Sequence, residues 1–121
     1  MCEYSYKWEA LSMNSKIKDD NTDFLFKAIL QLHSIEECYQ FFEDLCTVSE
    51  IKALSQRIAV ARMLSEKRVY SEIVAATGAS TATISRVNRS LIYGCDAYDM
   101  VFSRLEEAGE MPAEMAGDRH E

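Results

Sequence analysis

Gly78 separates two short segments whose apolar residues recur at helical spacing, and this pattern constrains the fold more than any other feature of the 121-residue sequence. The first segment, residues 70–77, directs Ile73 and Val74 inward and ends where a glycine can adopt a left-handed backbone at little cost. Ser80 follows and can cap a second helix. The pattern predicts a helix-turn-helix, a motif whose second helix lies in the major groove of DNA.

The two faces of the predicted second helix differ in chemistry. One face is apolar at i, i+3 and i+7: Ile84, Val87 and Leu91. The other face has small or hydrogen-bonding residues and no acidic one: Thr81, Ala82, Thr83, Ser85, Arg86, Asn88 and Arg89. A helix that faced only water would normally include Glu or Asp. We expect base edges to be approached by Thr81, Ala82 and Ser85, and phosphates by Thr83, Arg86 and Arg89.

Charge is segregated along the chain, although the formal net charge is −7. Residues 51–92 hold 7 Lys and Arg against 2 Asp and Glu, a net of +5. Residues 1–50 (4 against 10) and 93–121 (2 against 8) each carry −6. DNA affinity depends on local phosphate neutralisation, so the basic segment indicates nucleic-acid contact. Its basic residues are Lys52, Arg57, Arg62, Lys67, Arg68, Arg86 and Arg89.

A solvated basic face, paired with the acidic flanks of the same chain, is the alternative explanation of this pattern. It is the weaker one because the basic segment coincides with the predicted helix-turn-helix.

The remaining composition argues against several other classes of protein. The cysteines are scattered and show no zinc-binding spacing, which favours reduced thiols in a cytoplasmic protein: Cys2, Cys38, Cys46 and Cys95. No nucleophile–base pair, paired carboxylates or phosphate-binding loop is present, so we expect neither an enzyme nor a metal site. No apolar run is long enough to span a membrane, and the first residues lack a signal pattern.

The scarcity of Pro (1) and Gly (4) favours an all-α fold. We expect a flexible arm over residues 1–20, a helical domain over 21–108 with the helix-turn-helix at about 70–92, and an acidic disordered tail over 109–121. Capping boxes at Ser34 and Thr47 predict two helix starts, the second helix running to about Lys67. Asp96 is expected to cap the last helix, from about Ala97 to Ala108.

The N-terminal helices have more apolar surface than a chain this small can cover. Only Lys27 and Gln31 interrupt the apolar run from Phe24 to Leu32. We therefore expect a symmetric homodimer that places two reading helices about one DNA turn apart. The alternative is that these faces pack on one another in a monomer.

The stretch from Cys46 to Leu91 resembles the core of the Trp repressor superfamily, especially its branch of YerC/YecD-type Trp repressor-like proteins. The most specific stretches are LSQRIAVARMLSE and GASTATISRVNRSL. The segments IEECYQFFEDLCT and IYGCDAYDMVFSRL extend the resemblance to about residues 22–107. It implies an intertwined all-α homodimer and a sequence-specific DNA-binding transcriptional regulator, by type a repressor.

The resemblance also implies an effector pocket. In the Trp repressor a corepressor indole is held between two arginines, which match Arg57 and Arg86 here. The hydroxyl positions of that pocket match Thr47 and Ser90. Guanidinium planes stack on aromatic faces, which fits a tryptophan-like corepressor. Phosphate contacts or an ion pair within the dimer are equally good explanations of the two arginines.

Three positions depart from the family pattern at this pocket. Val87 stands in place of a glycine beside the second arginine, where a β-branched side chain should crowd the ligand. Asp44 and Cys46 stand at positions where the pocket wall of the family has leucine. We therefore expect an effector other than tryptophan, or regulation without one.

The alternative function is a dimeric helical protein-interaction module without specific DNA binding. The helix-turn-helix would then contact protein, and the acidic tail would carry regulation. Salt-dependent binding to random DNA at low ionic strength separates the two functions.

Overall fold

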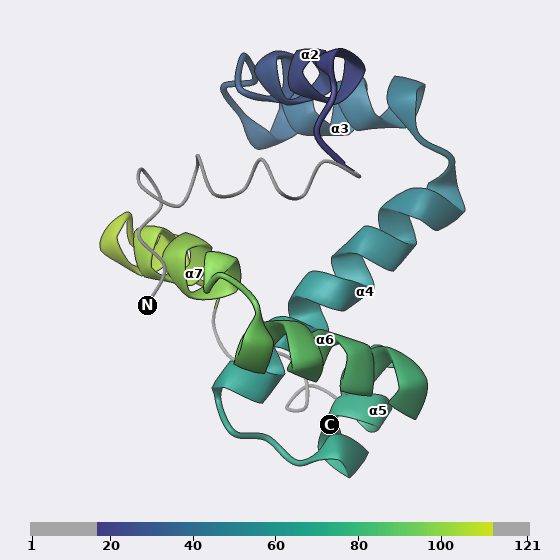
Figure 1. Cartoon of the computed structure of the whole chain (residues 1–121), viewed down its shortest axis with the longest axis vertical. Helices are drawn as coiled ribbons and strands as arrows, with labels where there is room; N and C mark the ends of the chain where they lie inside the picture. Colours follow the sequence, from purple (N-terminus) through teal and green to yellow (C-terminus); the bar gives the residue numbers. More distant parts are fainter. Residues whose placement is uncertain (1–16, 113–121) are drawn as a thin grey trace. The chain divides into compact units, whose positions relative to one another are not determined.

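The computed structural model describes residues 17–112, and the regular secondary structure in that range is entirely α-helical. The helices are α2 (Asp20–Ile29), α3 (Ile35–Leu45), α4 (Val48–Ser65), α5 (Tyr70–Thr77), α6 (Thr81–Tyr93) and α7 (Ala97–Glu107) (Figure 1). The predicted all-α fold is confirmed. None of the helices within residues 17–112 is long and apolar enough to cross a membrane.

The chain divides into two compact units, residues 1–51 and 52–121, and α4 passes from the first into the second. In the N-terminal unit, the Thr22 N–H donates to the Asp19 carboxylate at 2.7 Å and so caps α2. This bond stabilises the charged form and lowers the pKa of the Asp19 carboxyl. Because of the cap, α2 begins at Asp20, inside the predicted arm, whose residues 1–16 lie outside the described range.

The predicted capping box at Thr47 is complete, whereas at Ser34 the Glu37 carboxylate accepts the N–H of the residue before the N-cap. The Ser34 hydroxyl accepts the Glu37 N–H at 3.1 Å, and the Glu37 carboxylate accepts the preceding His33 N–H at 2.8 Å. At the start of α4, the Glu50 N–H donates to Thr47 Oγ1 at 3.1 Å and the Thr47 N–H donates to Glu50 Oε1 at 2.8 Å. These bonds satisfy amides that the first helical turn leaves unpaired, so local sequence sets both helix starts.

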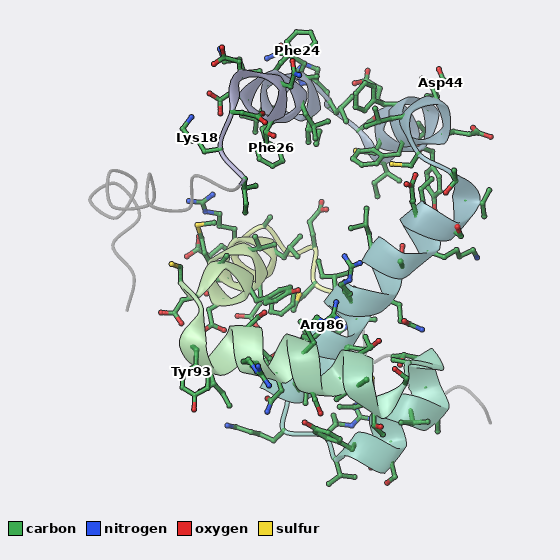
Figure 2. All side chains as sticks on the ribbon, turned by 45° about the vertical axis from the view of Figure 1, so that its right-hand side comes forward. Lys18, Phe24, Phe26, Asp44, Arg86 and Tyr93 are labelled. Atoms are coloured by element: carbon green, nitrogen blue, oxygen red, sulfur yellow. The ribbon has the colours of Figure 1, made fainter. Side chains whose placement is uncertain are left out.

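The helices α2 and α3 bury none of their residues. Large apolar side chains remain exposed on both, among them Phe24 (73%), Leu30 (77%) and Tyr39 (72%). Figure 2 shows Phe24 and Phe26 on α2. Contiguous exposed apolar surface usually marks a contact surface.

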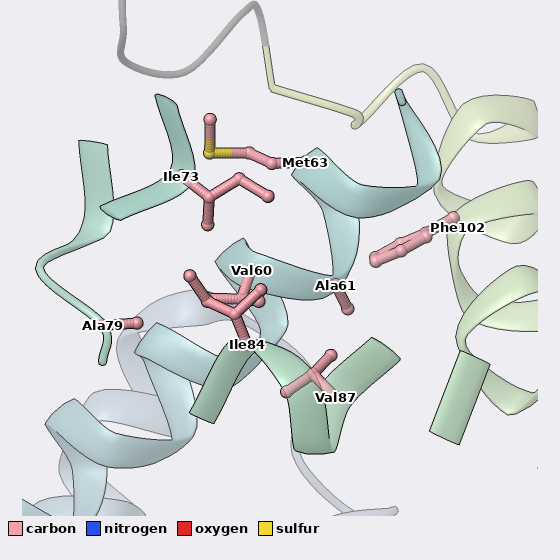
Figure 3. Packing of buried hydrophobic residues seen from close by; sticks show 8 residues of the cluster. All are labelled: Val60, Ala61, Met63, Ile73, Ala79, Ile84, Val87 and Phe102. Atoms are coloured by element: carbon pink, nitrogen blue, oxygen red, sulfur yellow. The ribbon is translucent and has the colours of Figure 1, made fainter. Parts of the chain in front are cut away.

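The C-terminal unit contains the buried core of the described chain. Its members come from α4, α5, the turn after α5, α6 and α7: Val60, Ala61, Met63, Ile73, Ala79, Ile84, Val87 and Phe102 (Figure 3). Phe102 also stacks on Tyr98, with ring centroids 6.0 Å apart. The second half of α4 thus forms the support on which the two helices of the helix-turn-helix and α7 pack.

The helix α4 ends at Ser65, two residues before the predicted end. Lys67 has a left-handed backbone (φ +67), its N–H donates to the Leu64 carbonyl at 2.9 Å, and the Arg68 N–H donates to the Met63 carbonyl at 3.0 Å. This is a Schellman motif. The prediction was wrong here because lysine is a good helix former and rarely takes the left-handed position.

The helix α7 begins at Ala97 as predicted, but the Asp96 side chain does not cap it. Asp96 has a left-handed backbone (φ +62), and its carbonyl accepts the Met100 N–H at 3.0 Å. An N-cap residue normally has an extended backbone, which brings its side chain to the first amides. The left-handed conformation therefore explains the missing bond.

The chain stays packed beyond the start of the predicted tail. Gly109 (φ +71) turns the chain after α7, and Met111 packs against the core. The Pro112 carbonyl accepts a hydrogen bond from Arg62 Nη2 at 2.7 Å. Met111 and Pro112 therefore make long-range contacts that local composition does not reveal. Residues 113–121 lie outside the described range.

Candidate nucleic-acid interface

The turn between α5 and α6 has the predicted chemistry. Gly78 adopts the left-handed conformation (φ +73, ψ 6) that ends α5. The Thr77 hydroxyl accepts the Ala79 N–H at 3.1 Å. The Ser80 hydroxyl accepts the Thr83 N–H at 3.1 Å and so caps α6. These local bonds fix the direction in which α6 leaves the turn.

The inner face of α6 holds the helix against the core. Ile84 and Val87 are 0% and 2% exposed, and Leu91 packs partly buried beside them. Ile73 of α5 is 0% exposed in the same cluster (Figure 3). Since these positions are fixed by packing, the opposite face of α6 is fixed as well.

The outer face of α6 is open to solvent. Five of the six predicted DNA-contacting residues are exposed: Thr81, Ala82, Ser85, Arg86 and Arg89. The sixth, Thr83, is half-buried, and its hydroxyl accepts a hydrogen bond from the Ser80 hydroxyl at 3.2 Å. The predicted surface is therefore continuous along one helix face, and the roles of its individual residues stay predictions.

Two of the seven basic residues in segment 51–92, Arg62 and Arg68, are engaged with other groups of the protein. Arg62 is 7% exposed, and its Nε donates to the Glu66 carboxylate at 2.9 Å. Arg68 forms ion pairs with Glu66 at 3.5 Å and Glu72 at 3.1 Å. These two arginines serve packing and ion pairing. The two carboxylates in these ion pairs, Glu66 and Glu72, lie inside the basic segment, and Arg62 Nη2 also donates to the Pro112 carbonyl.

The other five basic residues are exposed and form no ion pair within residues 17–112. They are Lys52 and Arg57 on α4, Lys67 after it, and Arg86 and Arg89 on α6. Unpaired guanidinium and ammonium groups are free to replace counterions on a phosphate backbone.

Two of the implied pocket residues are engaged in local hydrogen bonds. Thr47 caps α4, and the Ser90 hydroxyl donates to the Arg86 carbonyl at 3.4 Å. Arg57 and Arg86 are exposed. Thr47 belongs to the N-terminal unit and the other three to the C-terminal unit, so the pocket that they would share stays a prediction.

Val87 lies on the core face of α6, as its apolar spacing predicts. Its side chain is only 2% exposed and belongs to the hydrophobic core of the C-terminal unit. It therefore stabilises the packing of α6, and its effect on the implied tryptophan pocket stays a prediction. The other two departures, Asp44 and Cys46, are exposed and half-buried respectively in the N-terminal unit.

Sequence reasoning missed one residue that positions the motif. Gln56 of α4 donates its side-chain amide to the Thr77 carbonyl at 3.1 Å, across 21 residues of sequence. The bond ties the last turn of α5 to α4. Gln56 is one of eight polar residues among the 18 of α4, so the sequence carries no distinctive signal for it, and its partner depends on the tertiary fold.

Within residues 17–112 no cluster of three or more His, Cys, Asp or Glu side chains is arranged to hold a metal ion. The chemistry that the described site offers is therefore that of hydroxyls, guanidinium groups and helix-end amides.

Comparisons with known proteins agree with the geometry. The family model for the Trp repressor protein matches residues 20–106. The uncharacterized protein YerC of Bacillus subtilis is 55% identical over 92 residues, which are 76% of this chain and 88% of that protein.

Two solved structures are similar over 76% of this chain with a TM-score of 0.74. One is a TrpR-like protein from Eubacterium eligens, 59% identical and 95% covered. The other is a candidate Trp repressor from Staphylococcus aureus, 54% identical and 92% covered.

Proposed function

The chain belongs to the Trp repressor family, and from this premise we propose that it is a sequence-specific DNA-binding transcriptional regulator, by type a cytoplasmic repressor. The observation that carries the proposal is the outer face of α6. That face is exposed, rich in hydroxyls, positively charged and without acidic residues. A helix with this chemistry, seated on a rigid core, fits the major groove of DNA.

The residues of α6 divide into two roles. Thr81, Ala82 and Ser85 approach base edges, directly or through water. Thr83, Arg86 and Arg89 contact phosphates and supply affinity. Because the first turn has no Gln or Asn for bidentate adenine contacts, DNA shape and bridging water contribute to sequence choice.

The active form in this proposal is a homodimer. Full burial of an apolar side chain contributes about 1.5–3 kcal/mol. Phe24, Leu30 and Ile35 are 73%, 77% and 67% exposed, so burying these three on each of two chains contributes at most roughly 9–18 kcal/mol. That range is similar to the cost of association, about 4–15 kcal/mol. A second copy therefore offers sufficient compensation, and a two-fold axis places the two α6 helices about 34–36 Å apart.

Two substitutions on α6 test the division of roles. Arg89→Ala should weaken binding to specific and random DNA alike. It should also reduce the slope of log K against log salt by about 2 for a dimer, because each lost phosphate contact contributes about 0.9. Thr81→Ala should change the preferred sequence and leave the salt slope unchanged.

Both variants are compared with Ser103→Ala, a hydroxyl deletion on the exposed surface of α7. The measurement is fluorescence anisotropy with labelled duplexes at several salt concentrations. Equal losses on specific and random DNA for both α6 variants would contradict the assigned roles. Salt-independent or absent binding to random DNA would instead favour the protein-interaction module.

A further inference from the structure

A groove of about 400 Å³ lies between α4 and α5 in the C-terminal unit. On α4 it is lined by residues at i, i+3, i+4 and i+7, namely Lys52, Ser55, Gln56 and Ala59. Ala76 lines it from α5. The hollow exists because the facing side chains Ser55, Ala59 and Ala76 are small, so the two helices leave space between them.

The lining combines positive charge with an apolar floor. Lys52 is exposed and forms no ion pair within residues 17–112, and no acidic side chain lines the groove. The Ser55 hydroxyl is a further donor beside it. The half-buried Ala59 and Ala76 supply the apolar part, and Met63, which is 0% exposed, closes the groove beneath them. Such a surface favours a small anion that has an apolar chain.

The groove lies at the attachment point of the helix-turn-helix. Gln56 and Thr77 both line it, and the Gln56 side chain donates to the Thr77 carbonyl at 3.1 Å. The Thr77 hydroxyl also donates to the Ile73 carbonyl at 2.8 Å. A ligand that touches both α4 and α5 can do so only while α5 is docked on α4, so its binding favours that arrangement.

We propose that this groove binds a small organic carboxylate with a short branched apolar chain, and that its occupancy tightens DNA binding. The carboxylate contacts Lys52 and Ser55, and the apolar chain covers Ala59 and Ala76. The second part rests on the proposed function. The site differs from the tryptophan pocket implied by the family resemblance, because Arg57, Arg86 and Ser90 do not line the groove.

The ligand test uses NMR of the ¹⁵N-labelled full chain titrated with 4-methylpentanoate. Its neutral isostere, 4-methylpentanamide, and tryptophan are titrated in parallel. We expect 4-methylpentanoate to shift the backbone amide signals of Ser55, Ala59 and Ala76, and we expect 4-methylpentanamide to bind more weakly. The site would be overturned by shifts confined to other residues, by equal binding of 4-methylpentanamide, or by no shift at all.

Two variants assign the contact. Lys52→Met should weaken carboxylate binding by roughly 1.5-fold to fivefold, the range for an exposed charge pair. Lys67→Met is the matched control, since that lysine is exposed but lies outside the groove. Ala59→Leu fills the groove and should abolish the ligand-induced shifts. The other amide signals should keep the positions that they have in the folded wild type. Equal effects of the two lysine variants would contradict the assigned role of Lys52.

The DNA test repeats anisotropy with and without 4-methylpentanoate. We expect tighter DNA binding by the wild type and no change for Ala59→Leu. Carboxylate binding at the groove with unchanged DNA affinity would overturn the regulatory part. Binding of the carboxylate by a protein that binds no DNA would overturn the proposed function and uphold the ligand site.

Discussion

Replacing Val87 by alanine should lower the free energy of unfolding by about 0.5–2.5 kcal/mol and should not create a tryptophan site. The two expectations follow from one observation. The Val87 side chain is 2% exposed and packs within the core of the C-terminal unit (Figure 3). Truncation therefore opens a cavity in that core rather than making room in a surface pocket.

The magnitude follows from the number of methyl groups removed. Loss of one buried methyl group, as in Ile→Val, costs about 0.5–1.5 kcal/mol, so the loss of two costs about 1–3 kcal/mol. Alanine is the better helix former, which returns about 0.5 kcal/mol because Val87 lies within α6. The net expectation is therefore about 0.5–2.5 kcal/mol.

The assay is urea unfolding followed by circular dichroism at one fixed protein concentration, because dimerisation makes the midpoint concentration-dependent. Ser85→Ala on the exposed face of the same helix is the control and should stay within about 0.5 kcal/mol. Calorimetric titration with tryptophan is run on both variants. A cost below about 0.5 kcal/mol, or new tryptophan binding by the Val87 variant, would refute this reasoning.

Three further changes test local features. Gly78→Ala should destabilise the protein by about 1 kcal/mol, because its Cβ would meet no atom within 4 Å and only the left-handed backbone is strained; thermal unfolding checks this, and a larger cost would indicate a steric clash. Lys67→Gly should raise stability by up to about 1 kcal/mol, because φ is +67 there; a lower midpoint in urea would contradict it. The Asp19 cap of α2 should be fully present above the ordinary carboxyl pKa of 3.8 and should be lost as pH falls through the lowered pKa. Hydrogen exchange at the Thr22 amide measures the cap, with Asp19→Ala as the control. Exchange at Thr22 that is equal in the wild type and the control at every pH would count against the cap.

Local sequence chemistry predicted the helix-turn-helix closely. Residues 70–77, Gly78 and the Ser80 cap all have the expected conformation. These features are set by backbone preferences and hydrogen bonds that span three or four residues. The exposed face of α6 was predictable for the same reason, because helical spacing separates it from the core face.

Features that depend on distant partners were less predictable. The anchoring of Pro112 by Arg62 joins residues 50 apart, and the Gln56–Thr77 bond joins residues 21 apart. The pairing of Arg62 with Glu66 was readable, since the two are four residues apart on one helix. The net charge of +5 for residues 51–92 already allows for the two carboxylates, and it equals the number of basic residues in that segment that form no ion pair within residues 17–112.

The most direct test of DNA reading by a paired α6 is selection of duplexes from a random pool by the purified full chain, in dilute buffer, with and without tryptophan. We predict enrichment of a two-fold symmetric sequence whose half-site centres are about 10–10.5 base pairs apart, independent of tryptophan. Failure to retain any duplex at low salt would contradict DNA binding itself. Enrichment of an asymmetric site would contradict the paired arrangement.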